Sequence, residues 1–291
     1  MANPLEDYDL SQLKIRSSKQ CSVGGGQMFY LSYGSLGTVQ PIQTPPMSCT
    51  FNVRVQEPTT GNSVYCSPTV TMDPAELDDQ TSDVAKFHDF WLKFEERCKE
   101  LLCQHADFGG TMDDLGPTTD KWKSAITVDE AGKYPPSWRV KVDVGSTVSA
   151  AQDNPRSRKN KFLKLAAYDT EGTNVKVTEL EGQAIPRNSV VSFVAYPRYI
   201  FAAFKCKTVV LQTFTDMCQL YELAPYIPDV EDGGGRGEAD DPSRYTEKPP
   251  NFATMKRTST AAGFVGFETS RDEVDSATDA FNAINKRSRH D

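Results

Sequence analysis

The sequence has no long apolar run and no recognisable targeting segment. No hydrophobic stretch approaches the roughly 18 residues that suggest a membrane span. The first residues, MANPLEDYDLSQLK, lack the basic start and apolar centre of a secretory signal. We therefore expect a soluble intracellular protein made in the cytosol, located in the cytoplasm, or in the nucleus of the host cell if the protein is viral.

Residues suited to acid–base or metal chemistry are also scarce. The three histidines, at positions 88, 105 and 290, lie in no nucleophile or metal motif, and no G-x-S-x-G or H-E-x-x-H pattern is present. The seven cysteines form no C-x-x-C pair, and the cluster Cys98, Cys103 and His105 lacks a second pair at zinc spacing. Gly24-Gly25-Gly26 precedes a predicted strand without G-K-[ST], which excludes a P-loop. We expect no enzymatic activity, no metal and no cofactor.

Composition indicates one folded domain between less ordered ends. The chain has 291 residues and 38% hydrophobic content, and its mean hydropathy of −0.52 is low for a chain folded throughout. We predict a flexible arm over residues 1–18, a folded domain over 19–222 and a disordered tail over 223–291. Within the tail, an acidic Gly- and Pro-rich run at 229–241 precedes a possible short helix at 270–284.

One helix is predicted, between residues 83 and 104. Ser82 is a good N-cap, and Asp83 is favourable in the first turn. Bulky apolar residues recur at three- and four-residue spacing, which gives one apolar stripe that we expect to pack against a sheet. Its members are Val84, Phe87, Trp91, Phe94, Cys98 and Leu101.

Short β-branched and aromatic runs predict strands on both sides of this helix. Before it, strands are expected within 27–72, where Phe51, Val53 and Val55 alternate with polar residues and should face inward. After it, residues 134–214 predict a small twisted sheet or closed barrel, with Gly172 supplying the positive φ of a hairpin turn. The five strands predicted there are Trp138–Val144, Phe162–Tyr168, Asn174–Leu180, Ser189–Ala195 and Tyr199–Phe214, the last bent or doubled.

Charge separates this second sheet from the remainder of the chain. Residues 134–214 hold twelve Lys and Arg against six Asp and Glu, a net charge of +6, whereas the whole chain carries −8. A locally basic sheet in an acidic protein suggests a polyanionic partner.

Aromatic and basic residues are interleaved along the strands of this sheet. Exposed rings can stack on bases while Lys and Arg track phosphates, which is how single-stranded nucleic acid is held without sequence readout. Trp138 shares a strand face with Val140 and is the ring most easily assigned to the core instead. The candidate binding residues are Trp138, Arg139, Lys141, Lys159, Lys161, Phe162, Lys164, Tyr196, Arg198, Tyr199, Phe204, Lys205 and Lys207.

The order of these segments resembles a known family. TPPMSCTFNVRV, then the bulky helix, YPPSWRVKV, an F-x-x-x-x-x-Y-D-x-x-G hairpin and YIFAAFKCKTVVLQ follow one another. This order resembles the single-stranded-DNA-binding proteins of nucleocytoplasmic large DNA viruses and similar chains in protists. The resemblance covers about residues 19–220 and implies an OB-fold, a five-stranded Greek-key barrel, within a mainly β (α+β) chain elaborated by N-terminal strands and one helix.

The resemblance and the residues together predict a sequence-nonspecific binder of single-stranded DNA that acts in replication, recombination or repair. The tail could recruit replication proteins, and the protein could form a homo-oligomer. Two alternatives stay open, a single-stranded RNA binder and a non-enzymatic scaffold that uses its β domain for protein–protein contacts.

Overall fold

The computed structural model describes residues 5, 8–21, 26–55, 65–116, 121–146, 161–203 and 208–227. The chain divides into two units, Ala2–Asp241 and a second made of Met1 with Pro242–Asp291, and all the described residues lie in the first. The predicted tail helix at 270–284, most of the tail and the cationic loop before Lys161 lie outside the described residues.

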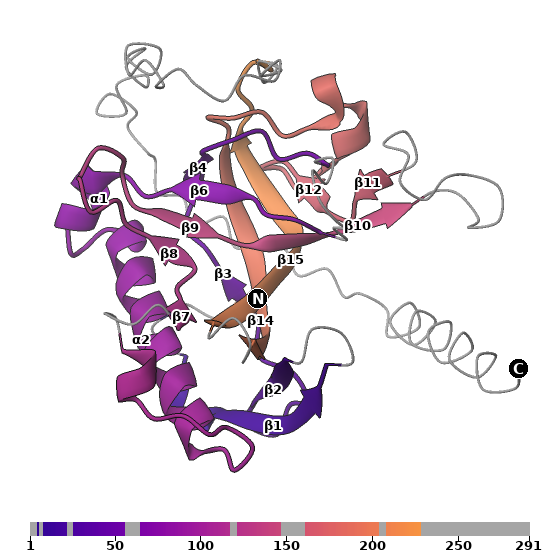
Figure 1. The fold of residues 1–291 in the computed structure, drawn as a ribbon. Helices are drawn as coiled ribbons and strands as arrows, with labels where there is room; N and C mark the ends of the chain where they lie inside the picture. The colour runs from indigo at the N-terminus through magenta and orange to yellow at the C-terminus, as the bar shows by residue number, and fades with distance from the viewer. Residues whose placement is uncertain are drawn as a thin grey trace, which may run out of the picture. The chain divides into compact units, whose positions relative to one another are not determined.

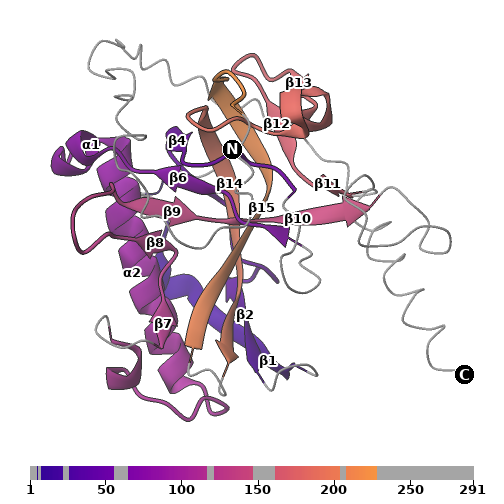
Figure 2. The ribbon, with the colours of Figure 1, turned by 45° about the horizontal axis from the view of Figure 1, so that its top comes forward.

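The centre of the first unit is a closed barrel of five strand positions (Figures 1 and 2). These positions are β4 (Met47–Cys49), β5 and β6 (Tyr65–Cys66, Thr69–Thr71), β9 and β10 (Ser137–Arg139, Lys141–Ser146), β14 (Val190–Ala203) and β15 (Thr208–Glu222). β4 pairs with β6, β6 pairs with β9, and β5 pairs with β10. β10 then pairs in parallel with β15, and β15 pairs with β14. The barrel closes because β14 also pairs with β4. The order 1-2-3-5-4-1 is that of an OB-fold, as expected.

Further strands extend the barrel. The hairpin of β1 (Leu13–Gln20) and β2 (Gln27–Tyr33) lengthens the sheet because β2 pairs with the last third of β14. β7 (Trp122–Lys123) and β12 (Ala166–Tyr168) both run parallel to β15. The remaining strands are β3 (Ile42–Gln43), β8 (Ile126–Thr127), β11 (Lys161–Leu163) and β13 (Asn174–Val175).

The helices are few. Among the described residues these are the short α1 (Pro74–Asp78) and the single 3-10 turns η2 (Leu10–Gln12), η3 (Asp113–Leu115), η5 (Val177–Glu179) and η6 (Glu181–Gln183). The longest helix of the described ranges, α2, spans Asp83–Gln104, and the Ser82 hydroxyl accepts a hydrogen bond from the amide of Ala85 at 3.0 Å. The predicted bounds and cap of this helix are confirmed. No helix in the described part of the chain is long and apolar enough to cross a bilayer.

α2 packs its aromatic stripe against the barrel, as the sequence predicts. Phe87 and Trp91 both lie edge-on to Trp138 of β9, at 5.4 and 5.1 Å between ring centroids. The buried Glu95 carboxylate accepts hydrogen bonds from the indoles of Trp91 and Trp122 and from the amide of Ala125. The donors from Trp122 and Ala125 fasten the segment that carries β7 and β8 to the helix, and the Trp91 donor lies on the helix itself.

Several sequence predictions differ from the structure. Leu13 begins strand β1 and is fully buried, so the predicted flexible arm over 1–18 does not extend beyond the turn η2. The predicted break between Ser189–Ala195 and Tyr199–Phe214 is also wrong. β14 continues through Pro197 because that proline lies at a β-bulge. The regular hydrogen bonding between the strands is already interrupted at the bulge, so the missing N–H of proline is tolerated there. Residues 177–179 are a 3-10 turn, so the predicted strand Asn174–Leu180 is only two residues long.

Two turn regions carry further detail. Gly172 has a φ of 83°, and the Asp169 carboxylate accepts from the amides of Glu171 and Thr173, which confirms the predicted hairpin between β12 and β13. By contrast, the chain bends after β4, so Val53 is buried while Phe51 is 63% exposed. The prediction that both face inward is therefore wrong for Phe51.

Candidate nucleic-acid interface

Strand alternation places two sets of side chains on opposite sides of β14. Phe193, Ala195, Ile200 and Ala202 belong to the buried core. Because successive side chains of a strand point to opposite faces, Tyr199 points outward from the barrel. Bulges near Pro197 shift the register there and set which residues of this wall face outward.

A line of rings crosses the outside of the barrel, which we call the outer aromatic line (Tyr30, Tyr199 and Phe214). Tyr30 of β2 is the register partner of Tyr199 of β14, and their ring centroids are 5.6 Å apart. Tyr199 in turn lies 6.2 Å from Phe214 of β15. Phe214 is only 8% exposed, yet it is not part of the core cluster. Side chains on the outer surface therefore cover it.

One of these covering side chains is a cation. The guanidinium of Arg198 lies 4.4 Å from the centre of the Phe214 ring. The same guanidinium lies 3.6 Å from the Asp143 carboxylate of β10. Arg198 thus connects the rings to the neighbouring strand and can stack against another planar group while remaining charged.

The third strand position of the barrel adds further cations beside this line. Lys141 of β10 is the register partner of Phe214, and Arg139 lies exposed two residues earlier, opposite Thr69 of β6. Lys164, which follows β11, is also exposed. Cations and rings therefore lie together across β10, β15 and β14, with a further ring on β2, a combination typical of surfaces that bind single strands.

Phe162 contributes a further ring at the β10 edge. It pairs with Gly145 of β10, and a Cβ at position 145 would come within 2.6 Å of its ring. The missing side chain at Gly145 is what lets the Phe162 ring lie against the strand.

Acidic and phenolic groups at the same surface have altered pKa values. Burial, followed by the nearby Asp216 carboxylate, raises the pKa of Tyr196 to about 12. Burial also raises the pKa of Asp216, and the Asp143 charge adds to this shift. Tyr196 is therefore a neutral phenol at ordinary pH.

The structure separates the predicted site residues into three groups. Arg139, Lys141, Tyr196, Arg198 and Tyr199 come together on the outer wall, with Phe162 and Lys164 at its β11 side. Trp138 is 0% exposed between α2 and the barrel, so its assignment to the interface is corrected: its ring is core. Lys159, Phe204, Lys205 and Lys207 lie outside the described residues, as does the side chain of Lys161, whose backbone belongs to β11.

Sequence reasoning missed two members of the outer aromatic line. Tyr30 lies in QMFYLSY, a strand assigned to the N-terminal half, and Phe214 ends the run VVLQTF. The alternation of Tyr30 with the core residues Phe29 and Leu31 was a usable signal. Nothing in the local sequence places Tyr30 beside Tyr199, because that pairing depends on barrel assembly.

Phe51 forms a second exposed aromatic site where the chain leaves β4. Together with Arg54, Cys66 and Thr69 it lines a shallow groove, and Thr69 is the register partner of Arg139. In OB-folds, the face of strand positions 2 and 3 and the loop between positions 1 and 2 commonly take oligonucleotides. Phe51 therefore extends the candidate interface.

Cys49, Cys66 and His105 are packed into the described part of the fold. Within the described ranges no group of three or more His, Cys, Asp or Glu side chains could hold a metal ion. Cys49 and Cys66 are buried free thiols whose pKa burial raises to about 12. His105 packs edge-on to Phe29 at 5.2 Å, a structural role.

Comparisons with known proteins give a likeness of fold. No family model and no curated protein matches the chain. The single-stranded DNA-binding protein gp2.5 of bacteriophage T7 is 13% identical, with 68% of this chain and 98% of that chain covered and a TM-score of 0.42. The single-stranded DNA-binding protein of bacteriophage Enc34 in complex with ssDNA is 10% identical, with 74% and 96% covered and a TM-score of 0.38. At these values the proposals below depend on this chain's own geometry.

Proposed function

We propose that the protein binds single-stranded DNA without strong sequence preference, as a non-enzymatic coating protein in replication, recombination or repair. The observation that carries the proposal is the outer aromatic line with the Arg198 guanidinium over Phe214. Bases of a single strand would stack on Tyr199 and Tyr30, while Lys141 and Arg139 contact phosphates. Stacking tolerates any base because every base has a π-face.

Single strands fit this surface better than duplex does. In a duplex the faces of the bases are stacked on one another and are not available to protein rings. Among nucleic acids, only an unpaired strand therefore offers base faces to these rings, whose centroids are 5.6 and 6.2 Å apart. Arg198 would add a cation to the same run of stacked groups.

The first experiment is a fluorescence anisotropy titration of labelled oligo-dT at two salt concentrations, with duplex DNA and oligo-U as competitors. We expect tight binding at low salt. The logarithm of the binding constant should fall linearly with the logarithm of the salt concentration, with a slope of about −0.7 for each phosphate contacted. Duplex should compete poorly. Equal competition by oligo-U would favour a general single-strand binder that includes RNA, and absence of binding at low salt would refute the proposal.

A scaffold that binds another protein through the β domain is the second candidate, favoured by the exposed ring of Phe51. The affinity of an apolar protein interface would change little with salt, whereas an affinity that depends on phosphate contacts falls steeply as the salt concentration rises. Recruitment of replication proteins by the tail, homo-oligomer formation and kinship with proteins of nucleocytoplasmic large DNA viruses stay predictions. The solved structures named above are phage proteins.

A further inference from the structure

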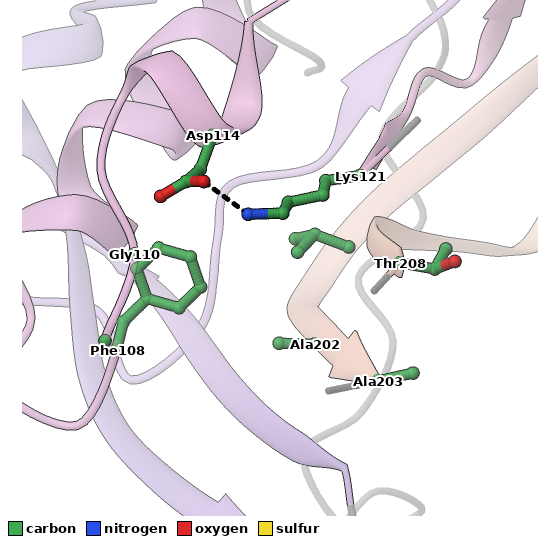
Figure 3. Close-up of a pocket in the computed structure, with 9 residues that line it drawn as sticks. Phe108, Gly110, Asp114, Lys121, Ala202, Ala203 and Thr208 are labelled. Atoms are coloured by element: carbon green, nitrogen blue, oxygen red, sulfur yellow. Dashed lines mark hydrogen bonds and ion pairs between the residues drawn. The ribbon is translucent and has the colours of Figure 1, made fainter. Parts of the chain in front are cut away.

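A pocket lies at the end of the β14–β15 hairpin, apart from the outer aromatic line. It separates the hairpin from the segment that follows α2, and Figure 3 shows Phe108 on one side with Ala202 and Ala203 on the other. Its volume is about 260 Å³, just below the ~300 to 1,000 Å³ usual for small-molecule sites. The pocket can therefore take a single ring system but not an extended ligand.

Two facing walls of this pocket are apolar. The Phe108 ring lies close to Gly110, where a Cβ would come within 2.5 Å of it, and it also contacts the ring of Phe29 edge-on at 6.3 Å. The opposite wall is made of Ala202, Ala203 and Val209, whose small side chains leave the space open. A flat apolar group can lie between these walls.

One edge of the pocket is polar. The Lys121 ammonium donates to the Asp114 carboxylate (Figure 3), and Asp114 also accepts from the amide and hydroxyl of Thr111. The hydrogen bond from Lys121, followed by those from Thr111, lowers the pKa of Asp114 to about 2. Asp114 is therefore ionised at ordinary pH and balances the Lys121 charge.

This balance decides which ligand suits the pocket. An ammonium group has three N–H donors, and Asp114 takes one of them. Lys121 can thus donate to a neutral acceptor, while the adjacent carboxylate disfavours a free anion. The combination of apolar walls and one donor at the edge fits a planar heterocycle with a carbonyl oxygen.

We propose that this pocket binds one base of the single strand held by the outer aromatic line, and that Lys121 donates to an exocyclic carbonyl. Thymine, cytosine and guanine carry such an oxygen, whereas adenine does not. The inference rests on the proposed function, because the strand must first lie along the hairpin. Tyr199 and Ala203 are four residues apart on β14, roughly 13 Å at ~3.3 Å per residue. One bound strand can therefore reach both places.

The test measures base preference, not affinity alone. Labelled oligo-dT is competed with unlabelled oligo-dT and oligo-dA of equal length, for the natural protein, Lys121→Met and Lys123→Met. Lys123 of β7 is exposed and does not line the pocket. Lys123→Met is therefore the control, because it removes the same positive charge outside the pocket. We expect Lys121→Met to lower the preference for dT over dA by about threefold, the lower end for loss of one hydrogen bond, because only one base of the strand would occupy the pocket. Lys123→Met should weaken both competitors equally.

A second variant, Ala203→Leu, fills the pocket and removes no charge. It should lower the same preference while Tyr199→Ala weakens every oligonucleotide and leaves the preference intact. Oligo-dA stacks on itself, which lowers its competition equally for every protein tested. The decisive quantity is therefore the change in the preference for dT over dA between the natural protein and variants whose melting temperature is unchanged. If the natural protein binds no oligonucleotide, the proposed function fails. If it binds and both pocket variants keep its preference, only the pocket inference is overturned.

Discussion

Two groups of aromatic rings differ in their surroundings, one between α2 and the barrel and the other on the outside of β2, β14 and β15. The inner group, Phe87, Trp91, Phe94 and Trp138, is fully buried, with ring centroids 5.1 to 5.8 Å apart where they contact. The outer aromatic line has similar spacings of 5.6 and 6.2 Å. Residue type and ring spacing therefore do not distinguish a core from a binding surface. What covers the rings does distinguish them: the inner group is enclosed between α2, which carries three of its rings, and the barrel, whereas Arg198 and solvent cover the outer line.

The difference has an energetic meaning. Burying aromatic rings in a dry core contributes several kcal/mol each to folding. Partly exposed rings contribute less to stability and keep a face available for a ligand. Substitutions of inner rings should therefore change stability, and substitutions of outer rings should change binding.

The largest effect is expected for Trp138→Ala. Removing this ring leaves a cavity between α2 and β9 and should lower the free energy of unfolding by about 3–5 kcal/mol, measured by urea denaturation. Trp138→Phe should cost less, since the indole N–H has no hydrogen-bond partner. Loss of oligonucleotide binding at unchanged stability would show that Trp138 acts as an interface residue after all.

The converse change, Tyr199→Ala, should spare the fold. We expect binding of oligo-dT to weaken by about 1–3 kcal/mol, the value for one base stacked on an aromatic side chain, at an almost unchanged urea midpoint. Tyr221→Ala is the matched control, because Tyr221 is 43% exposed on β15 but lies outside the line. Equal loss in both variants would mean that the line has no special role.

A smaller effect should follow from Asp143→Asn. This change removes the carboxylate that faces Arg198, so the surface becomes more cationic and oligo-dT should bind about two- to fivefold more tightly at low salt. Asp89→Asn on α2, also at an exposed carboxylate, should change nothing. Tightening by both variants would indicate a response to net charge instead of to this surface.

The smallest effect concerns pH. Since the pKa of Asp216 is raised, chiefly by burial, this group takes up a proton in the folded protein at a higher pH than when unfolded. Its contribution to stability therefore grows as pH falls through the folded pKa, and the outer surface loses a negative charge. Binding of oligo-dT should tighten by less than about twofold between pH 7 and pH 5. The Asp216→Asn variant should lack this pH response, and a response of the same size in the variant would exclude Asp216 as its source.

Local signals were sufficient for some elements and insufficient for others. The α2 bounds follow from the Ser82 cap and the apolar stripe, and the Gly172 turn follows from its DTEG sequence, because both depend on interactions within a few residues. β14 could not be predicted whole, since Pro197 is tolerated only through a bulge that neighbouring strands create. β1 was missed because its eight residues are mostly polar and gain their order from pairing with β2.

The sequence by itself determined a mainly β chain with one amphipathic helix, a cationic sheet and aromatic residues interleaved with Lys and Arg. Only the tertiary structure decided which rings are available. Closure of the barrel buried Trp138 beneath α2, turned Phe214 outward under Arg198, and brought Tyr30 beside Tyr199. The physical reason is that strand alternation is local, whereas the side that becomes the interior depends on which strands pair and what packs over them.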